Sequence, residues 1–341
     1  VVLGPYAVQE FATDSRAIFT AVDTYYQGKP RIPRVEIVAN QQPAVAFDAL
    51  KSGRANWIHA LPPSLYQQAR ADPTLDLKEW TAANATYRTL EFNVTRPFLS
   101  DKRVRQALAY AINRADLLNT AEQGLAVPQY GFVQPTNQRW LNPSLVTYDF
   151  DLPKARQLLT DAGYRLQNNK LVDKDGQPIK LQVFFPTSSA PRATIATSLQ
   201  QQYKPLGIEV ELKGLDFAAY TEQVQNRRDF DISLAAYGGG SLDPDLGPKA
   251  QLVSAGMQNV TGYANPQVDE LFRQAGAEMD TVKRKQLYDQ AQMLVNADVP
   301  SHYLYALKAV DVFSRQVQGV TPTKADRLDA NDALLVWSVA Q

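Results

Sequence analysis

Residue types that carry out covalent chemistry are scarce in this sequence of 341 residues. It contains no cysteine and only two histidines, His59 and His302. The lack of cysteine excludes disulfides, thiol nucleophiles and thiolate metal sites, and two histidines leave little for a metal centre or a general base. A G-x-S-x-G elbow is absent as well, which argues against a serine hydrolase. We therefore interpret both histidines as structural or partly exposed residues.

The strongest candidate for a binding site is the segment that begins at Tyr237. Its candidate residues are Tyr237, Gly238, Gly239, Gly240, Asp243 and Asp245. The glycines either form a flexible turn or let the main chain approach a ligand closely, because no Cβ intervenes. The two aspartates either stabilise a turn or a helix end, or divide into a general acid and a general base. No Walker A or G-x-G-x-x-G pattern is present, so phosphate binding by either loop is not supported.

Aromatic residues supply a further candidate. The chain has 16 tyrosines and four tryptophans, most of which must lie in a core. One or two of them in a cleft would supply the rigid, amphipathic surface that ligand sites favour. We take Trp140 as the tryptophan in that role.

The composition is that of an ordinary soluble globular protein with at least two domains. Apolar residues make up 45% and charged residues 21% of a chain longer than the roughly 100 to 200 residues of one domain. Lys and Arg balance Asp and Glu at 35 each, so no net field attracts nucleic acid or an anionic membrane. No apolar run approaches the roughly 18 to 20 residues of a membrane helix, and no segment resembles a signal peptide. Because the first residue is Val1, we expect a processed chain or a fragment.

The elements that position the glycine loop are most regular between Lys180 and Tyr237. Strands are predicted at 181–185, 208–212 and 230–237, with helices at 193–203 and 217–225 between them. This is a βαβαβ unit, whose right-handed crossovers place helices on both faces of a mainly parallel sheet. Ligands of such sheets sit beyond the carboxyl ends of strands, which is where the glycines lie.

Several other elements have recognisable ends. Ser100 is predicted to cap a helix that carries Val104, Leu108 and Ile112, and Asp151 to cap the next helix. The remaining predictions are strands at 34–39 and 86–93, helices at 45–50, 62–71, 268–275 and 287–295, a hairpin turn at 172–176, and short strands from 302 onward.

Sequence blocks along the whole chain resemble one family. The longest consists of Phe92-Asn93, Pro97-Phe98 and the run DKRVRQALAYAINR at 101–114, and it is similar to the signature of the family 5 extracellular solute-binding proteins. These are the dipeptide, oligopeptide and nickel type receptors of ABC importers. Further blocks in matching order lie at 4–6, 26–30, 49–53, 151–155, 158–159, 162–164, 229–232 and 262–269.

The resemblance implies an α/β, periplasmic-binding-protein-like (type II) fold with two lobes that enclose the solute. Residues 1–90 would form the remaining part of lobe I, residues 91–308 lobe II, and residues 309–341 the return to lobe I. The crossings would lie near 88–92 and 305–310. In this family the block at 4–6 falls well inside the mature chain, so we expect the amino-terminal portion to be missing.

The same resemblance implies a receptor that carries out no covalent chemistry, without enzyme activity, cofactor or metal. It would capture a peptide-like or other small polar solute by hinge closure and deliver it to membrane permease subunits, in the periplasm or outside the cell. Membrane association would come from the transporter or from a lipid anchor outside this chain. The alternatives are the ligand-sensing domain of a transcriptional regulator and, below it, a hydrolase that uses Asp243 and Asp245.

The chain departs from the peptide-binding members at the predicted site. Ala236-Tyr237 replaces their Gly-Trp, and Gly240 stands where they place the acidic residue that pairs with the peptide's α-amino group. A buried ammonium without that carboxylate would be costly, which argues against a free peptide amine. Arg88, in the first crossing strand, would either bind a carboxylate or phosphate of the solute or form a salt bridge with Glu91 or another neighbour. The candidate solute contacts are thus Tyr237, Gly238, Gly239, Gly240, Asp243, Arg88 and Trp140.

Overall fold

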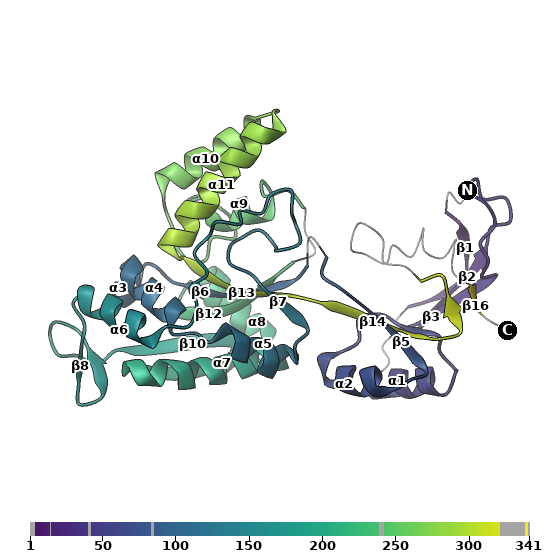
Figure 1. Cartoon of the computed structure of the whole chain (residues 1–341), viewed down its shortest axis with the longest axis horizontal. Coiled ribbons are helices and arrows are strands. Elements are labelled where there is room, and N and C mark those ends of the chain that lie inside the picture. The colour runs from purple at the N-terminus through teal and green to yellow at the C-terminus, as the bar shows by residue number, and fades with distance from the viewer. Residues whose placement is uncertain are drawn as a thin grey trace. The chain divides into compact units, whose positions relative to one another are not determined.

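A computed structural model of the chain describes residues 4–13, 15–39, 42–82, 85–238 and 242–320, and the backbone at 338–339. The candidate residues Gly239 and Gly240 lie outside the described residues. The chain divides into two compact units, each shown in Figure 1. Unit 1 comprises Val1–Ala82 and Lys308–Gln341, and unit 2 comprises Ala83–Leu307. The assignment of 1–90, 91–308 and 309–341 to lobes stays a prediction.

Unit 2 is built on a sheet of six strands in the order β11-β10-β12-β6-β13-β7. The strands are β6 Tyr87–Phe92, β7 Ala126–Pro128, β10 Lys180–Pro186, β11 Glu209–Leu215, β12 Ile232–Tyr237 and β13 Ser301–Leu307. Strand β10 pairs in parallel with β11 and β12, which confirms the predicted βαβαβ unit. The prediction of a mainly parallel sheet is wrong for the whole sheet, because β6, β13 and β7 join it by antiparallel pairing.

Helices cover both faces of this sheet. Helix α7 (Ala190–Tyr203) joins β10 to β11, and α8 (Phe217–Thr221), which continues as a π-helical turn at Glu222–Asn226, leads to β12. Val183 of β10 packs in the large core that includes α7, whereas the next residue, Phe184, packs with Tyr220 of α8. Since neighbouring residues of a strand point to opposite faces, α7 and α8 lie on opposite sides of the sheet.

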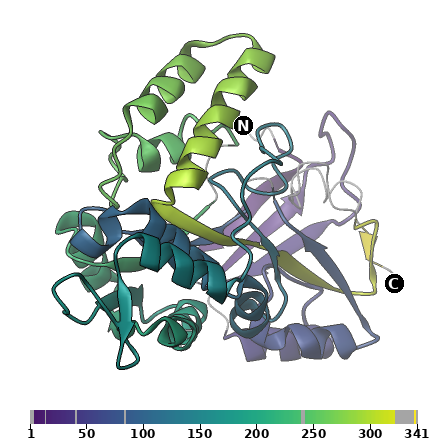
Figure 2. The ribbon, with the colours of Figure 1, turned by 60° about the vertical axis from the view of Figure 1, so that its left-hand side comes forward.

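The remaining elements of unit 2 are mostly helical. They are α3 Pro97–Ser100, α4 Lys102–Tyr110, α5 Arg114–Glu122, α6 Leu152–Asp161, η1 Lys204–Leu206, α9 Gly247–Leu252, α10 Pro266–Ala277 and α11 Thr281–Asp298, with the hairpin β8 Arg165–Gln167 and β9 Lys170–Val172. The predicted turn at 172–176 is confirmed, because Gly176 N donates to Asp173 O. Figure 2 shows α10 and α11, both of which were predicted as amphipathic helices, packed as an antiparallel pair.

One predicted helix cap is wrong and another is confirmed. Asp101, rather than Ser100, caps α4, since its carboxylate accepts from Arg103 N at 2.8 Å. The Ser100 hydroxyl instead donates to Pro97 O, within the preceding short helix. Ile112 lies beyond the end of α4 at Tyr110. The Asp151 cap of α6 is confirmed, since this carboxylate accepts from Lys154 N at 2.8 Å.

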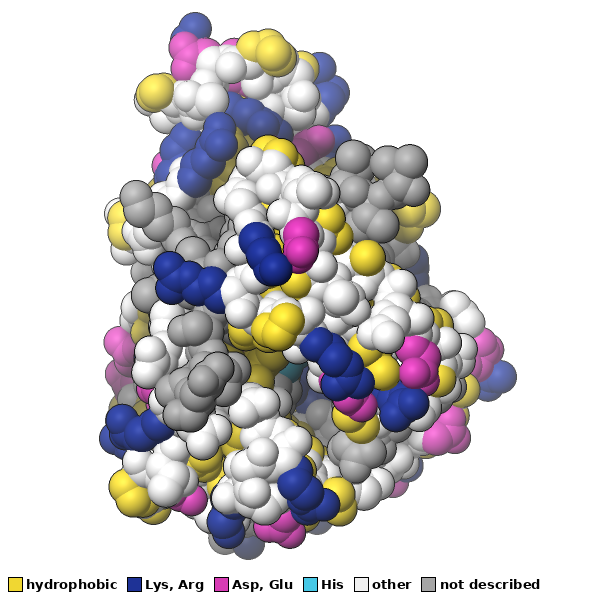
Figure 3. Space-filling model, turned by 90° about the vertical axis from the view of Figure 1, so that its right-hand side faces the viewer, with side chains coloured by type: hydrophobic (Ala, Val, Ile, Leu, Met, Phe, Trp, Pro, Cys, Tyr) yellow, Lys and Arg dark blue, Asp and Glu magenta, His cyan; other side chains and the backbone are white. Residues whose placement is uncertain are grey.

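The described residues of unit 1 contain two three-stranded sheets, one two-stranded sheet and two helices. One sheet has the order β1-β2-β3 (Tyr6–Ala12, Arg16–Ala21, Arg34–Val38), the other β4-β14-β5 (Trp57–Ile58, Ala309–Ser314, Leu75–Trp80), and β15 Val317–Gln318 pairs with β16 Ser338–Val339. Helix α1 Pro43–Lys51 agrees with the helix predicted at 45–50, and α2 Pro63–Ala71 with the helix whose start was predicted from its prolines. Strands β1 and β2 were not predicted, and their outward side chains include the exposed Val8 and Phe11. The face drawn in Figure 3 intersperses hydrophobic side chains with acidic and basic ones.

Arg105, inside the family-like block at 101–114, joins two helix ends in unit 2. Its side chain is buried and its guanidinium donates to the carbonyl oxygens of Leu99, Ser100, Asp298 and Val299. These carbonyls end α3 and α11, whose last C=O groups have no partner within their own helix. The buried arginine therefore satisfies several polar groups at once, and burial lowers its pKa.

We expect Arg105→Ala to lower the free energy of unfolding by about 3 kcal/mol or more, because it leaves buried carbonyls without donors. Urea unfolding followed by circular dichroism measures this change. The matched control is Arg156→Ala, because Arg156 is exposed and donates a single bond to Pro205 O. Equal losses of stability in both variants would contradict the role given to Arg105.

Candidate functional site

The carboxyl edge of the unit 2 sheet gathers loop segments from distant parts of the chain. Thr187 follows β10, Asp216 follows β11, and Gly238 follows β12. Tyr87, at the start of β6, pairs with Tyr237, so the antiparallel strand β6 begins at the same edge. Ligands of open α/β sheets bind beyond such an edge. This edge is the candidate site of unit 2, and it contains Arg88, Tyr237 and Gly238 among the predicted contacts.

Tyr237 is bonded to a buried carboxyl group on the face of the sheet that α8 covers. Its hydroxyl donates to Glu91 Oε1 at 2.5 Å, and the side chain of Glu91 is only 4% exposed. Burial raises the pKa of Glu91 to about 7, while hydrogen bonds from Tyr237 and Ser233 act in the opposite direction. The rings of Tyr87 and Tyr237 lie 5.9 Å apart, and Tyr303 lies 5.8 Å from Tyr87. This cluster fixes the Tyr237 ring and places an ionisable group beneath the edge.

Arg88 points to the opposite face and pairs with a carboxylate that was not predicted. Its Nε donates to Glu122 Oε1 at 3.2 Å, and the two side chains are 13% and 3% exposed. Tyr305 also donates to this carboxylate oxygen, at 3.3 Å. Successive residues of β6 face opposite sides of the sheet, so Arg88 and Glu91, three positions apart, lie on different faces. The salt bridge of Arg88 is therefore made with Glu122, another neighbour. A role of Arg88 in solute binding stays a prediction.

Gly238 is required by packing against the first residues of the opposite strand. A Cβ on Gly238 would lie 2.3 Å from Thr86 Cα and 2.7 Å from Thr86 N. Real contacts are never this short, so no other residue fits without a shift of the backbone. The close main-chain approach predicted for this glycine thus exists within the protein itself, between the end of β12 and the start of β6.

Asp243 and Trp140 are brought together by Arg284 of α11. Arg284 forms a bidentate salt bridge with Asp243, in which both N–O distances are 2.8 Å. The same guanidinium lies over the Trp140 ring, 5.2 Å from its centroid, and Trp140 is only 3% exposed. Gly276 of α10 packs against Asp245, which pairs with Lys249. These residues fasten the segment after the glycines to α10 and α11, and solute contact by Asp243 or Trp140 stays a prediction.

This pairing leaves little for the hydrolase alternative. Asp243 and Asp245 each contact a cation, Arg284 and Lys249 respectively. Within the described ranges, no group of three or more His, Asp or Glu side chains is placed to hold a metal ion.

The two histidines have different environments. His302 is buried, and its pKa is lowered well below the usual value by burial and then by the charge of Arg114. His59 of unit 1 is 68% exposed, and its Nδ1 lies 3.0 Å from Asp311. Asp311 is fully buried and also accepts from Trp57 Nε1 and Ala60 N. The bond to Asp311 raises the pKa of His59. Both residues thus agree with the interpretation as structural or partly exposed.

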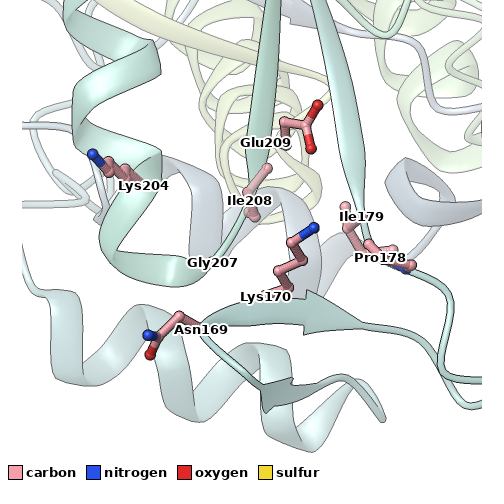
Figure 4. A pocket seen from close by; sticks show the side chains of 8 residues that line it. All are labelled: Asn169, Lys170, Pro178, Ile179, Lys204, Gly207, Ile208 and Glu209. Atoms are coloured by element: carbon pink, nitrogen blue, oxygen red, sulfur yellow. The ribbon is translucent and has the colours of Figure 1, made fainter.

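A cavity of about 140 Å³ lies at the other end of β10 and β11 (Figure 4). Ile179 and Ile208, which precede these two strands, line it together with Lys170, Lys204 and Glu209. It therefore opens at the amino ends of the parallel strands, where α/β sheets do not place their ligands. We do not assign it to the candidate site.

The sequence did not identify three residues of this edge as site residues: Glu91, which was named only as a possible partner of Arg88, Glu122, and Arg192 in the first turn of α7. A carboxyl residue within the apolar segment Leu90–Phe92 was a signal of a buried ionisable group. Arg192 follows Pro191 at a helix start, a position where a cation is disfavoured by the helix dipole. Nothing in the sequence indicates that Glu122 lies beside Arg88.

The family of the chain follows from comparison with known proteins. A family model described as "Bacterial extracellular solute-binding proteins, family 5 Middle" matches residues 1–259. The chain therefore belongs to the family 5 bacterial extracellular solute-binding proteins. The ABC transporter substrate-binding protein CtaP from Listeria monocytogenes superposes with a TM-score of 0.86 at 25% identity, over 99% of this chain and 67% of that protein. The α/β fold expected of a periplasmic-binding-protein-like chain is confirmed.

Two curated relatives show the range of the family. The dipeptide-binding protein of Escherichia coli is 24% identical over 319 residues, which is 93% of this chain and 58% of that protein. Heme-binding protein A of Haemophilus influenzae is 25% identical over 301 residues, 87% of this chain and 53% of that protein. The chain thus spans between half and two thirds of the length of these relatives. Among the described helices, none combines the length and apolar character of a membrane crossing.

We expect Gly238→Ala to lower the free energy of unfolding by about 1 to 3 kcal/mol, because the added methyl group meets the Thr86 backbone. The control is Gly247→Ala, where nothing lies within 4 Å of the added Cβ. That change should be neutral or slightly stabilising. Thermal and urea unfolding of both variants test this, and an unchanged stability of Gly238→Ala would refute the packing argument.

The stability of the Glu91→Gln variant relative to wild type should be greater at pH 8 than at pH 5. The unfolded chain releases the Glu91 proton near its ordinary pKa of 4.5, whereas the folded chain holds it up to about pH 7. The free energy of unfolding of the wild type should therefore fall by about 2 to 3 kcal/mol between these pH values, and the glutamine variant should escape that loss.

Urea unfolding of both proteins at pH 5 and pH 8 measures this difference. Glu209→Gln, at an exposed glutamate paired with Lys180, is the control. A stability difference between wild type and Glu91→Gln that does not change with pH would show that Glu91 ionises normally in the folded state.

Proposed function

We propose that this chain is the solute-binding part of an ABC importer receptor, working in the periplasm or outside the cell. It captures a peptide-like or other small polar solute, releases it chemically unchanged, and delivers it to a membrane permease. The family match over residues 1–259 carries this proposal. The name of the family describes extracellular solute-binding proteins, and the relatives named above bind a dipeptide and heme.

Within unit 2 we place the solute at the carboxyl edge of the sheet. Tyr237 and Arg88 would supply an aromatic ring and a cation there. Arg284 pairs with Asp243 and lies over Trp140, which holds the segment from residue 242 onward against α11. Glu91 holds the Tyr237 hydroxyl, so that the ring keeps one orientation.

Native mass spectrometry of the protein purified from its natural source tests the proposal. We expect one small molecule bound without a covalent link. After removal, return and long incubation, the same molecule should be recovered with an unchanged mass.

A chemical product after incubation would instead support the hydrolase alternative. Copurified DNA, with no small molecule, would support the regulator. Arg284→Ala, which removes the ion pair with Asp243, should carry less solute than wild type. The exposed control Arg165→Ala should carry the same amount as wild type.

A further inference from the structure

Strands β10 and β12 separate toward the carboxyl edge of the unit 2 sheet. They pair only at Val183 with Ile232 and at Phe184 with Ser233. By contrast, β10 and β11 share seven residue pairs, and β12 and β6 share six. Beyond Phe184 and Ser233, therefore, β10 and β12 leave a gap in the hydrogen-bonding pattern at the carboxyl edge.

This gap is also the topological switch point of the parallel strands. The chain leaves β10 through α7 to reach β11 on one side, and then through α8 to reach β12 on the other side of β10. The two helices lie on opposite faces, so their connections diverge above the gap. Open α/β sheets bind their ligands outside the carboxyl ends of the strands at such a switch point, and we refer to this place between β10 and β12 as the crevice.

Arg192, in the first turn of α7, is directed at the gap. Its Nη1 lies 3.5 Å from Leu234 O of β12, and its guanidinium carbon lies 6.0 Å from the ring centroid of Tyr220. Its Nε is buried, and none of the residues that the structure describes accepts a hydrogen bond from it. A buried donor without a partner is costly, and so is a cation at a helix start. Both costs are removed by an anion that binds the guanidinium.

Arg88 adds a second positive charge to the same place. Burial lowers the pKa of Arg192, and the nearby charge of Arg88 lowers it further. Glu122 contacts Arg88, but within the described part of the chain no carboxylate forms an ion pair with Arg192. Glu91 lies on the other face of the sheet, bonded to Tyr237. Two guanidinium groups thus face one contacting carboxylate, which leaves an excess of positive charge at the crevice.

We propose that the crevice between β10 and β12 binds an oxyanion of the solute, a carboxylate or a phosphate, through Arg192 with Arg88 beside it. The guanidinium fork matches the paired oxygens of both groups. This inference rests on the proposed function, because it states which class of solute the receptor carries. The solute is an anionic small molecule, recognised by its oxyanion rather than by an amine.

Titration with inorganic phosphate and with acetate tests the crevice directly. Proton–nitrogen spectra of the arginine Nε–H groups and the midpoint of thermal unfolding are followed, with chloride at equal ionic strength as the reference. We expect the Arg192 Nε–H signal to shift and saturate with at least one of the two anions. The anion that binds more tightly, phosphate or acetate, indicates whether the oxyanion of the solute is a phosphate or a carboxylate.

Variants separate the crevice from general charge effects. Arg192→Gln and Arg88→Gln should each weaken anion binding at least tenfold, and Arg165→Gln, in the hairpin strand β8, should leave it unchanged. Arg192→Lys keeps the charge without the fork and should bind more weakly than wild type, which provides a test should the glutamine variant not fold. Binding within twofold of wild type in the Arg192 variants, or no effect of either anion beyond chloride, would overturn the inference.

The solute found by mass spectrometry distinguishes this inference from the proposed function. A carried solute without carboxylate or phosphate overturns the inference and leaves the receptor function intact. Anion binding that depends on Arg192, in a protein that carries no solute, supports the crevice and contradicts the receptor function. A carried solute that bears an oxyanion, and is lost in Arg192→Gln, supports both.

Discussion

Six residue pairs between β6 and β12 hold the two halves of the unit 2 sheet together. On one side lie the parallel strands β10, β11 and β12, and on the other the antiparallel strands β6, β13 and β7. This pairing sets Tyr87 opposite Tyr237 and brings Thr86 against Gly238. A shift by one residue would exchange the two faces of β6 and move every side chain to the wrong side of the sheet. The candidate site therefore depends on this register.

The two faces of β6 place two carboxyl groups in different electrostatic environments. Glu91 receives hydrogen bonds from hydroxyl groups, and burial raises its pKa to about 7. Glu122, on the Arg88 face, is also buried, but an adjacent guanidinium opposes the rise of its pKa. Strand β6 thus carries a carboxyl group that changes charge near neutrality on one face and an arginine paired with a carboxylate on the other. Arg192 of α7 adds a second guanidinium near Arg88. The charge at the carboxyl edge is therefore mainly that of these two arginines.

Much of the local structure could be predicted from the sequence, whereas the site's partners could not. The βαβαβ unit follows from apolar periodicity and from short connections, both of which are local. Asp101 and Ser100 are adjacent and equally good caps, so the sequence alone did not decide between them. Glu122 lies 34 positions from Arg88 in the sequence. The lack of a hydrogen-bond partner for Arg192 Nε among the described residues is a property of the folded arrangement. These features depend on tertiary contacts that no periodicity records.

The residues that identify the family have mainly structural roles here. Asp101 caps α4 and Arg105 closes the ends of α3 and α11, and neither belongs to the carboxyl edge. Their burial and hydrogen bonds constrain the fold whatever the solute is. Under our proposal Arg88, where the resemblance leads us to expect an uncharged residue, and Arg192 instead contact the solute. On this view a family can keep one fold and bind solutes as different as a dipeptide and heme, because the groups that hold the fold and the groups that select the solute differ.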